Sequence, residues 1–203
     1  MLSTIREYGK SLLIAGLIVF FVRSFVAEAF AIPSGSMEPT LLVGDYLLVN
    51  RLSYVVKAPF TDIVLLDLGE PKQGDTVVFR FPLDHTKDFV KRVVAKGGDT
   101  VEIRDKMVYV NGCRYIDGST RFASPRDIPA FLSPRDNLGS VVVPRDSYFV
   151  MGDNRDDSYD SRFWGFVKRD DLIGKAEVVY FSRDHNAGPL HAVRWERVGH
   201  LIE

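Results

Sequence analysis

Ile32-Pro-Ser-Gly-Ser-Met-Glu-Pro-Thr-Leu41 separates an apolar N-terminal region from the rest of the chain. Prolines on both sides of a short Ser-Gly-Ser-Met core fix φ, so neither a helix nor a regular strand continues through it. Gly35 lets the chain turn sharply beside the Ser36 hydroxyl. Such a segment can hold one side chain and one backbone N–H in a fixed pose, as a nucleophile with an oxyanion donor requires. The alternative is an ordinary loop that leaves a hydrophobic helix.

The region before this segment predicts a membrane anchor. Residues 12–22 carry no charge, two basic residues precede them, and Arg23 and Glu28 interrupt the continuation. A membrane-spanning helix needs about 20 mostly apolar residues, so residues 11–31 form one only if Arg23 snorkels or is paired. Basic residues before the span place residues 1–10 in the cytoplasm and the remainder outside.

Two other interpretations of the N-terminal region stay open. Ala27-Glu28-Ala29 resembles the A-x-A site at which a secretory signal peptide is cleaved. A buried core helix fits less well, because the charged residues lie at one end only. The charge pattern favours a retained anchor over residues 1–31.

The remainder has the pattern of β strands. Gly-Asp turns lead into runs rich in β-branched and aromatic residues, and no window after residue 32 keeps a 3.6-residue apolar period. We therefore predict a mainly β protein with an antiparallel catalytic domain of residues 32–104 and 144–203. The predicted strand runs are 46–50, 76–81, 100–103, 141–143, 147–151 and 176–182.

Residues 105–143 have a different texture. Lys106 to Gly112 is typical of a hairpin strand that ends in an Asn-Gly turn, and a polar region with two Ser-Pro-Arg-Asp repeats follows. We predict an inserted small β subdomain rather than a disordered linker. Because it carries no residue assigned to the site below, we expect it to be dispensable for the chemistry.

Composition bounds the function. The 203 residues are 46% hydrophobic, which suffices for a core in one domain with an insertion. A formal net charge of −1 argues against nucleic acid as the main partner. The single cysteine, Cys113, excludes an internal disulfide and a cysteine-rich zinc site.

A serine nucleophile needs a base, and histidine is the usual one. No G-x-S-x-G or H-E-x-x-H motif is present, and no histidine has a triad context. Each is more typical of a surface residue. The four are His85, His185, His191 and His200.

Lys91 is the better candidate for the base. Its neighbours are apolar or aromatic, so a strand here could bury it against a hydrophobic face. Burial disfavours the ammonium form and lowers the pKa from about 10.4 towards neutrality. The alternative is a solvated strand lysine beside Arg92. No S-x-x-K motif exists, so the fold has to bring serine and lysine together.

The region from Gly152 to Gly165 is rich in carboxylates, arginine and serine. A solvated loop is the ordinary interpretation, and a calcium loop is disfavoured because the EF-hand glycine and terminal Glu are missing. The residue mixture suits a hydrogen-bonded scaffold that holds another segment in place.

Taken together, these segments resemble the bacterial type I signal peptidases (leader peptidases), the Ser-Lys dyad family, from Phe30 to Phe181. The motifs S-G-S-M-x-P-T-L, K-R-V-V-x-x-x-G-D and G-D-N-R-D-x-S-x-D-S-R-x-W-G occur in the family order. The resemblance implies that Ser36 is the nucleophile and Lys91 the general base, with the Ser34 hydroxyl and Ser36 N–H as oxyanion donors. It implies supporting roles for Ser158, which would orient Lys91, and for Asp153, Asp160 and Arg162. The implied substrate pocket is lined by Phe30, Ile32, Phe89 and Val90.

The resemblance also implies a setting. The family carries a β-rich catalytic domain on the outer face of the bacterial plasma membrane, needs no metal or other cofactor, and cuts signal peptides after small residues. The expected partners are therefore exported pre-proteins and membrane lipid, with the secretion translocon nearby. Many Gram-negative relatives have two N-terminal spans, and only one is visible here.

Two other classes of function remain. A self-cleaving repressor shares Ser-Lys chemistry, but it needs an N-terminal DNA-binding domain where residues 1–31 are apolar. A membrane-tethered β module without activity is disfavoured by the intact Ser36, Lys91 and Ser158.

Overall fold

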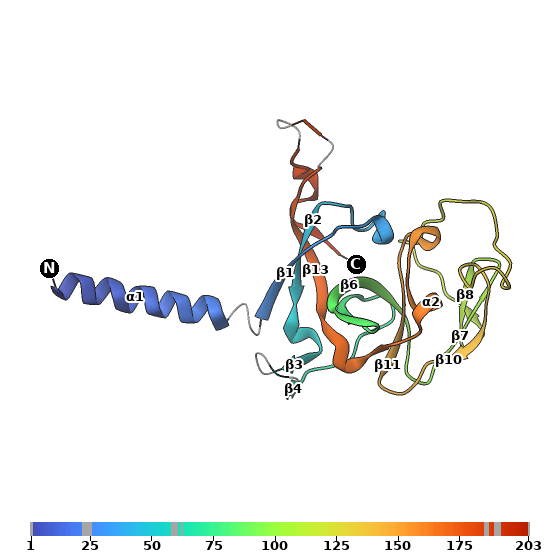
Figure 1. Cartoon of the computed structure of the whole chain (residues 1–203), viewed down its shortest axis with the longest axis horizontal. Coiled ribbons are helices and arrows are strands. Elements are labelled where there is room, and N and C mark those ends of the chain that lie inside the picture. The colour runs from blue at the N-terminus through green and yellow to red at the C-terminus, as the bar shows by residue number, and fades with distance from the viewer. Residues whose placement is uncertain are drawn as a thin grey trace.

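The computed structural model describes residues 2–21, 26–57, 61, 63–184, 187–188 and 192–202. One long helix extends from a β-rich body (Figure 1). The helices and strands in chain order are α1 (Leu2–Phe21), β1 (Ala27–Ala31), η2 (Gly35–Met37), β2 (Asp45–Asn50), η3 (Arg51–Ser53), β3 (Val55–Lys57), β4 (Val64–Asp67), β5 (Thr76–Phe81), β6 (Asp84–Lys96), β7 (Thr100–Arg104), β8 (Met107–Val110), β9 (Cys113–Arg114), β10 (Leu138–Val142), β11 (Ser147–Met151), η4 (Arg155–Asp157), α2 (Ser161–Trp164), β12 (Val167–Lys168), η5 (Arg169–Asp171), β13 (Leu172–Ser182), η6 (Trp195–Arg197) and β14 (His200–Leu201).

An antiparallel sheet of eight strands forms the main body. Its order is β1-β2-β13-β5-β6-β11-β12, with β14 paired to β13. The two longest strands, β6 and β13, contain register shifts where they pair with their neighbours, and bulges of this kind bend a sheet. The prediction of a mainly antiparallel β protein is confirmed.

The predicted insertion contributes to a second sheet in the order β10-β7-β8-β9, which also includes β7 (Thr100–Arg104) from just before the predicted boundary at residue 105. Strands β8 and β9 are joined at Asn111 and Gly112, whose φ values are 52° and 78°. Positive φ at both central residues is what a two-residue hairpin turn requires, and Asn-Gly supplies it at little cost. Buried residues of this sheet, among them Val101 and Val108, share one apolar cluster with Val94 and Phe149 of the main sheet.

Helix α1 lies outside the β body (Figure 1). The apolar side chains from Leu12 to Phe20 are exposed along its second half. Of the helices that the structure describes, none is both long enough and apolar enough to cross a membrane.

Residues 27–31 correct the predicted boundary of the apolar helix. The sequence interpretation extended it to residue 31, but Ala27–Ala31 is strand β1, paired with β2 from Ala27 opposite Asn50 to Ala31 opposite Tyr46. An alanine-rich segment has no strong β preference of its own, so pairing with β2 decides its conformation. The β body therefore begins about five residues earlier than predicted.

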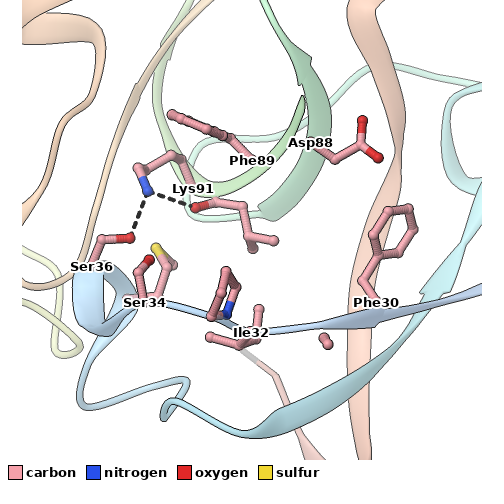
Figure 2. A pocket seen from close by; sticks show the side chains of 11 residues that line it. Phe30, Ile32, Ser34, Ser36, Asp88, Phe89 and Lys91 are labelled. Atoms are coloured by element: carbon pink, nitrogen blue, oxygen red, sulfur yellow. Dashed lines mark hydrogen bonds between the residues drawn. The ribbon is translucent and has the colours of Figure 1, made fainter. Parts of the chain in front are cut away.

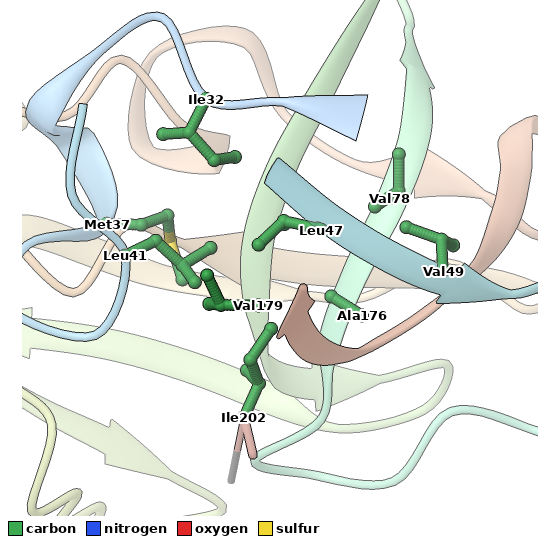
Figure 3. Close-up of a cluster of buried hydrophobic side chains, with 9 residues drawn as sticks. All are labelled: Ile32, Met37, Leu41, Leu47, Val49, Val78, Ala176, Val179 and Ile202. Atoms are coloured by element: carbon green, nitrogen blue, oxygen red, sulfur yellow. The ribbon is translucent and has the colours of Figure 1, made fainter. Parts of the chain in front are cut away.

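A cluster of buried aliphatic side chains lies beneath the Ser36 segment (Figure 3). Met37 and Leu41, on either side of the Pro39 turn, are 1% and 0% exposed. Full burial of such a side chain contributes about 1.5–3 kcal/mol, so these two residues fix the segment to the sheet. The other members come from the neighbouring strands and the C-terminal region: Ile32, Leu47, Val49, Val78, Ala176, Val179 and Ile202.

Candidate active site

Ser36 lies at the centre of the short helix η2. The Leu41 N–H donates to the Met37 carbonyl at 2.9 Å and closes the turn that follows. The Asn154 backbone N–H donates to the Ser36 carbonyl at 3.1 Å, and the Asn154 side-chain amide donates to the Gly35 carbonyl at 3.2 Å. The Ser36 segment is thus held from below by the core and from the side by residue 154.

Lys91 enters the site from β6, where it is paired with Val77 of β5. Its side chain is buried, and its Nζ donates to Ser36 Oγ at 2.7 Å and to the Val90 carbonyl at 3.0 Å (Figure 2). The Phe89 ring lies beside the same amine, 5.5 Å from Nζ to the ring centroid. Ser36 and Lys91 are 55 positions apart in the sequence, and the fold brings their side chains into hydrogen-bond contact.

The environment of Lys91 makes its amine a weaker base than an ordinary lysine. Burial lowers its pKa to about 8, against the opposing attraction of the Asp160 and Asp153 carboxylates. The Arg162 guanidinium lowers the pKa further. A substantial neutral fraction at mildly alkaline pH is what a lysine needs in order to accept a proton.

Arg92, the next residue on β6, points to the other face and is 3% exposed. Its guanidinium binds Asp153 through two N–H groups, each 2.8 Å from a carboxylate oxygen. Thr40 donates its hydroxyl to the same carboxylate. A charge-assisted bidentate pair of this kind ties the 152–165 loop to the strand that carries Lys91. The sequence gives Arg92 no role, because an arginine beside a lysine has no visible partner.

Asp160 and Arg162 form a second buried pair under the loop. Arg162 Nε and Nη2 each donate to the Asp160 carboxylate at 2.8 Å, and the Gly152 N–H donates to it at 3.0 Å. Burial would raise the pKa of Asp160, but Arg162 and the Gly152 N–H outweigh burial and hold the pKa below its usual value. The carboxylate is therefore charged and holds the loop rigid.

Ser158 is buried beside the site, and the structure shows no hydrogen bond between its Oγ and Lys91. Its hydroxyl instead helps Arg162 to lower the pKa of the Asp160 carboxyl, and the expected role in orienting Lys91 stays a prediction. The Lys91 amine is oriented by Ser36 and the Val90 carbonyl instead. Ser158 Oγ lies against Gly152, where an added Cβ would collide with it.

The predicted pocket residues lie around one hollow of about 120 Å³ next to Ser36 (Figure 2). Phe30 and Ile32 enter from β1 and the segment after it, whereas Phe89 and Val90 enter from β6. We call this hollow the acyl pocket. Its other lining residues are Ala31, Pro33, Ser34, Ser36, Met37, Asp88 and Lys91. Ser34 thus lines the acyl pocket beside Ser36, and its role as an oxyanion donor stays a prediction.

The inserted subdomain contacts the site, which the sequence did not indicate. Arg121 pairs with the loop through its backbone: its N–H donates to the Asp153 carbonyl at 2.8 Å and its carbonyl accepts from the Arg155 N–H at 2.9 Å. Its guanidinium binds Glu38 at 3.1 Å. Arg162 Nη1 donates to the Arg135 carbonyl at 2.8 Å. Residues of the inserted subdomain therefore contact the loop and the Ser36 segment, and the expectation that residues 105–143 are dispensable for the chemistry stays a prediction.

Neither histidine that the structure describes is near the site. His85 is exposed, with Nε2 3.6 Å from Asp171, and His200 is exposed on β14. His185 and His191 lie outside the described residues. Within the described ranges, no group of three or more His, Cys, Asp or Glu side chains is arranged to hold a metal ion.

The chain is similar to known proteins over most of its length. A model of the family described as signal peptidase, peptidase S26, matches residues 5–181. Signal peptidase I of Pseudomonas fluorescens is 38% identical over 87% of this chain and 72% of its own. Signal peptidase I of Aquifex aeolicus is 36% identical over 93% of this chain and 91% of its own.

A solved signal peptidase I from Enterococcus faecalis is similar over 53% of this chain and 97% of its own, with 29% sequence identity and a TM-score of 0.42. The matched residues 5–181 include every residue from Ser34 to Arg162 that forms the site described above. The chain belongs to the signal peptidase family, peptidase S26.

Proposed function

We propose that the chain is a Ser-Lys endopeptidase that removes N-terminal signal peptides from exported pre-proteins. The observation that carries the proposal is the 2.7 Å contact between Lys91 Nζ and Ser36 Oγ, made by a buried amine whose pKa burial lowers to about 8. A serine beside a neutral lysine is an activated nucleophile. The names of the relatives support the substrate class.

In the proposed reaction, neutral Lys91 accepts the Ser36 hydroxyl proton as Ser36 Oγ attacks the scissile carbonyl. The tetrahedral intermediate collapses, the C–N bond breaks, and protonated Lys91 returns the proton to the departing amine. The signal peptide is then an ester on Ser36. Lys91 then accepts a proton from water as the water oxygen attacks the ester carbon. The bond between that carbon and Ser36 Oγ breaks, and protonated Lys91 returns the proton to Ser36 Oγ as the carboxylic acid product leaves.

The oxyanion of both intermediates needs donors. We assign the Ser34 hydroxyl and the Ser36 backbone N–H to this role. Their support is position: Ser34 lines the acyl pocket beside Ser36, and η2 holds the backbone of residue 36 through Gly35 and Met37. The 152–165 loop is then held in place on the other side of Lys91 by four of its own residues: Asp153, Ser158, Asp160 and Arg162.

We assign the acyl pocket to the side chain before the scissile bond. Ile32 and Val90 give it apolar walls beside Ser36, which suit a small apolar side chain such as alanine. Strand β1 lies at the edge of the eight-stranded sheet. An edge strand offers backbone N–H and C=O groups to an extended peptide, which suits an A-x-A segment.

We infer a membrane attachment through the N-terminal apolar segment, with the catalytic domain on the periplasmic side of the bacterial inner membrane. The support is the uncharged run 12–22 after Arg6 and Lys10, and the exposed apolar side chains of α1. Membrane lipid is then a permanent partner, and the translocon that delivers pre-proteins lies close by. Reporter fusions after residue 35 test this topology: activity confined to a cytoplasmic reporter contradicts it.

The activity itself is tested with purified chain and a pre-protein that carries an A-x-A site. We expect a single cut after the second alanine and a signal-peptide ester on Ser36 that mass spectrometry detects after acid quenching. Ser36→Ala and Lys91→Ala are the matched inactive variants. An unchanged pre-protein, or equal cleavage by the Ser36→Ala variant, contradicts the proposal.

A further inference from the structure

A second cavity borders the Ser36–Lys91 pair. It has a volume of about 400 Å³ and shares four residues with the acyl pocket: Ser34, Ser36, Phe89 and Lys91. Its remaining wall is different, because it comes from the 152–165 loop: Asp156, Asp157, Ser158, Tyr159 and Phe163. The nucleophile and base therefore lie on the boundary between two cavities, one lined by residues before Ser36 and one lined by the loop.

The two carboxylates of the second cavity are not equivalent. Asp156 is engaged: Lys106 Nζ and the Ser124 N–H each donate to it at 2.7 Å. Asp157 is exposed, and its carboxylate makes no hydrogen bond or ion pair with any residue that the structure describes. One of the two negative charges is thus available to a bound molecule.

Aromatic rings form the neighbouring wall. Tyr159 and Phe163 are 52% and 39% exposed, and their centroids lie 5.5 Å apart. Phe89 is the ring that lines both cavities. Exposed aromatic faces attract cations, and so does an unengaged carboxylate. Arg162 and Lys91 already lie over the rings of Phe163 and Phe89, 5.8 and 5.5 Å from the ring centroids. Asp157 and the exposed Tyr159 ring are therefore the groups of this wall that favour a positively charged side chain over a negatively charged one.

We propose that this cavity binds the residues that follow the scissile bond and selects cationic over anionic side chains there, with Asp157 as the specificity-determining residue. The inference rests on the proposed function. When an acyl group occupies the acyl pocket, the peptide leaving Ser36 has to extend into the other cavity that borders the pair. Lys91 borders both cavities, so its amine can reach the leaving nitrogen from the same position.

The test uses internally quenched peptides with one A-x-A segment and with Lys, Gln or Glu at the first, second or third residue after the scissile bond. The readout is the ratio of kcat/KM for the Lys and Glu peptides at each position. In the unaltered chain we expect Lys to exceed Glu by about two- to fivefold at one position or more, the range of an exposed charge pair. High salt should reduce the ratio.

Asp157→Asn should bring that ratio close to one, and Asp157→Lys should invert it. Glu196→Gln, which removes an exposed carboxylate on η6, is the matched control and should keep the original ratio. Cleavage with equal Lys and Glu rates, or a preference that survives in Asp157→Lys, overturns the inference and leaves the proposed function intact. A chain that cuts none of the peptides contradicts both.

Discussion

The Cα of Gly152 lies so close to the Ser36 carbonyl oxygen that a side chain at residue 152 would collide with it. The same added Cβ would collide with Ser158 Oγ. Glycine is therefore required here for close approach rather than for an unusual φ, because Gly152 is not among the residues with positive φ. The loop and the nucleophile segment touch through backbone.

Gly152→Ala should consequently impair catalysis by moving Ser36. Overpacking of this kind costs about 1–3 kcal/mol of stability, and a misplacement of about 1 Å costs about 100-fold in rate. Gly139→Ala is the control, because nothing lies within 4 Å of its added Cβ. Urea unfolding and peptide kinetics distinguish the two variants. Full activity in Gly152→Ala would show that the contact does not position Ser36.

Lys91→Arg should abolish cleavage although it keeps the positive charge, because arginine does not deprotonate in this pH range. The expected loss is about 10²–10⁴-fold, the usual contribution of a general base. Lys91→Ala should be as inactive. Circular dichroism checks that both variants fold, and an active Lys91→Arg would require another base for Ser36.

The pH dependence follows from the direction of the Lys91 shift. Burial lowers its pKa to about 8, and the neutral form is the active one, so kcat/KM should rise with pH and level off above about 8. An ordinary lysine would put this limb near 10.4. Replacing His85 and His200 with Asn should leave the limb in place, since both are exposed and away from Ser36. A limb that moves or vanishes in these variants contradicts a lysine base.

Arg92→Lys should be costly, although the residue looks interchangeable in the sequence. Lysine cannot reproduce the two N–H donors that reach Asp153, and weakened bonds to a buried charge cost about 1.5–3 kcal/mol. The loss should appear in urea unfolding and in kcat. Arg104→Lys is the control, because its pair with Glu102 is exposed, and it should change stability by less than about 0.5 kcal/mol. If both variants have the same stability and the same kcat, the bonds from Arg92 to Asp153 do not hold the loop in place.

Lys106→Met tests the link between the inserted subdomain and the loop. Lys106 lies 2.7 Å from Asp156, and both side chains are mostly buried. Leaving that carboxylate short of one partner should cost about 1–3 kcal/mol in chemical denaturation. Lys87→Met removes an exposed pair with Asp84 and should cost less than about 1 kcal/mol. If both substitutions cost the same, the subdomain is not anchored through this pair.

The sequence predicted the strands whose pattern is local. The run 147–151 coincides with β11 and 76–81 with β5, because turn residues and β-branched runs mark them directly. Strand β4 was missed, since all four of its residues are exposed and it has no inside–outside alternation. Strand β1 was assigned to a helix, because only its partner β2, some 20 residues later, gives it a strand conformation.

The candidate site shows the same division. Its residues come from positions 34–36, 91–92 and 152–162, and no periodicity joins them; the family motifs did. A sequence motif identifies which residues belong to the site, but it does not show which side chains contact one another. They therefore left out the Arg92–Asp153 pair and the Arg121 bridge, and they implied a Ser158–Lys91 bond that the structure does not contain among its described residues.

Strand β1 also bears on how the chain avoids self-digestion. Ala27-Glu28-Ala29 is the kind of sequence that the chain is proposed to cut after, and it lies only seven residues before Ser36. These three residues pair with residues 48–50 of β2, and Glu28 also binds Arg51 at 2.7 Å. A peptide bond held in a sheet cannot be drawn across the nucleophile of its own molecule. Pairing with β2 thus holds a segment of the kind that the chain is proposed to cut in the sheet of its own molecule, and this segment leaves the sheet only when β1 detaches from β2.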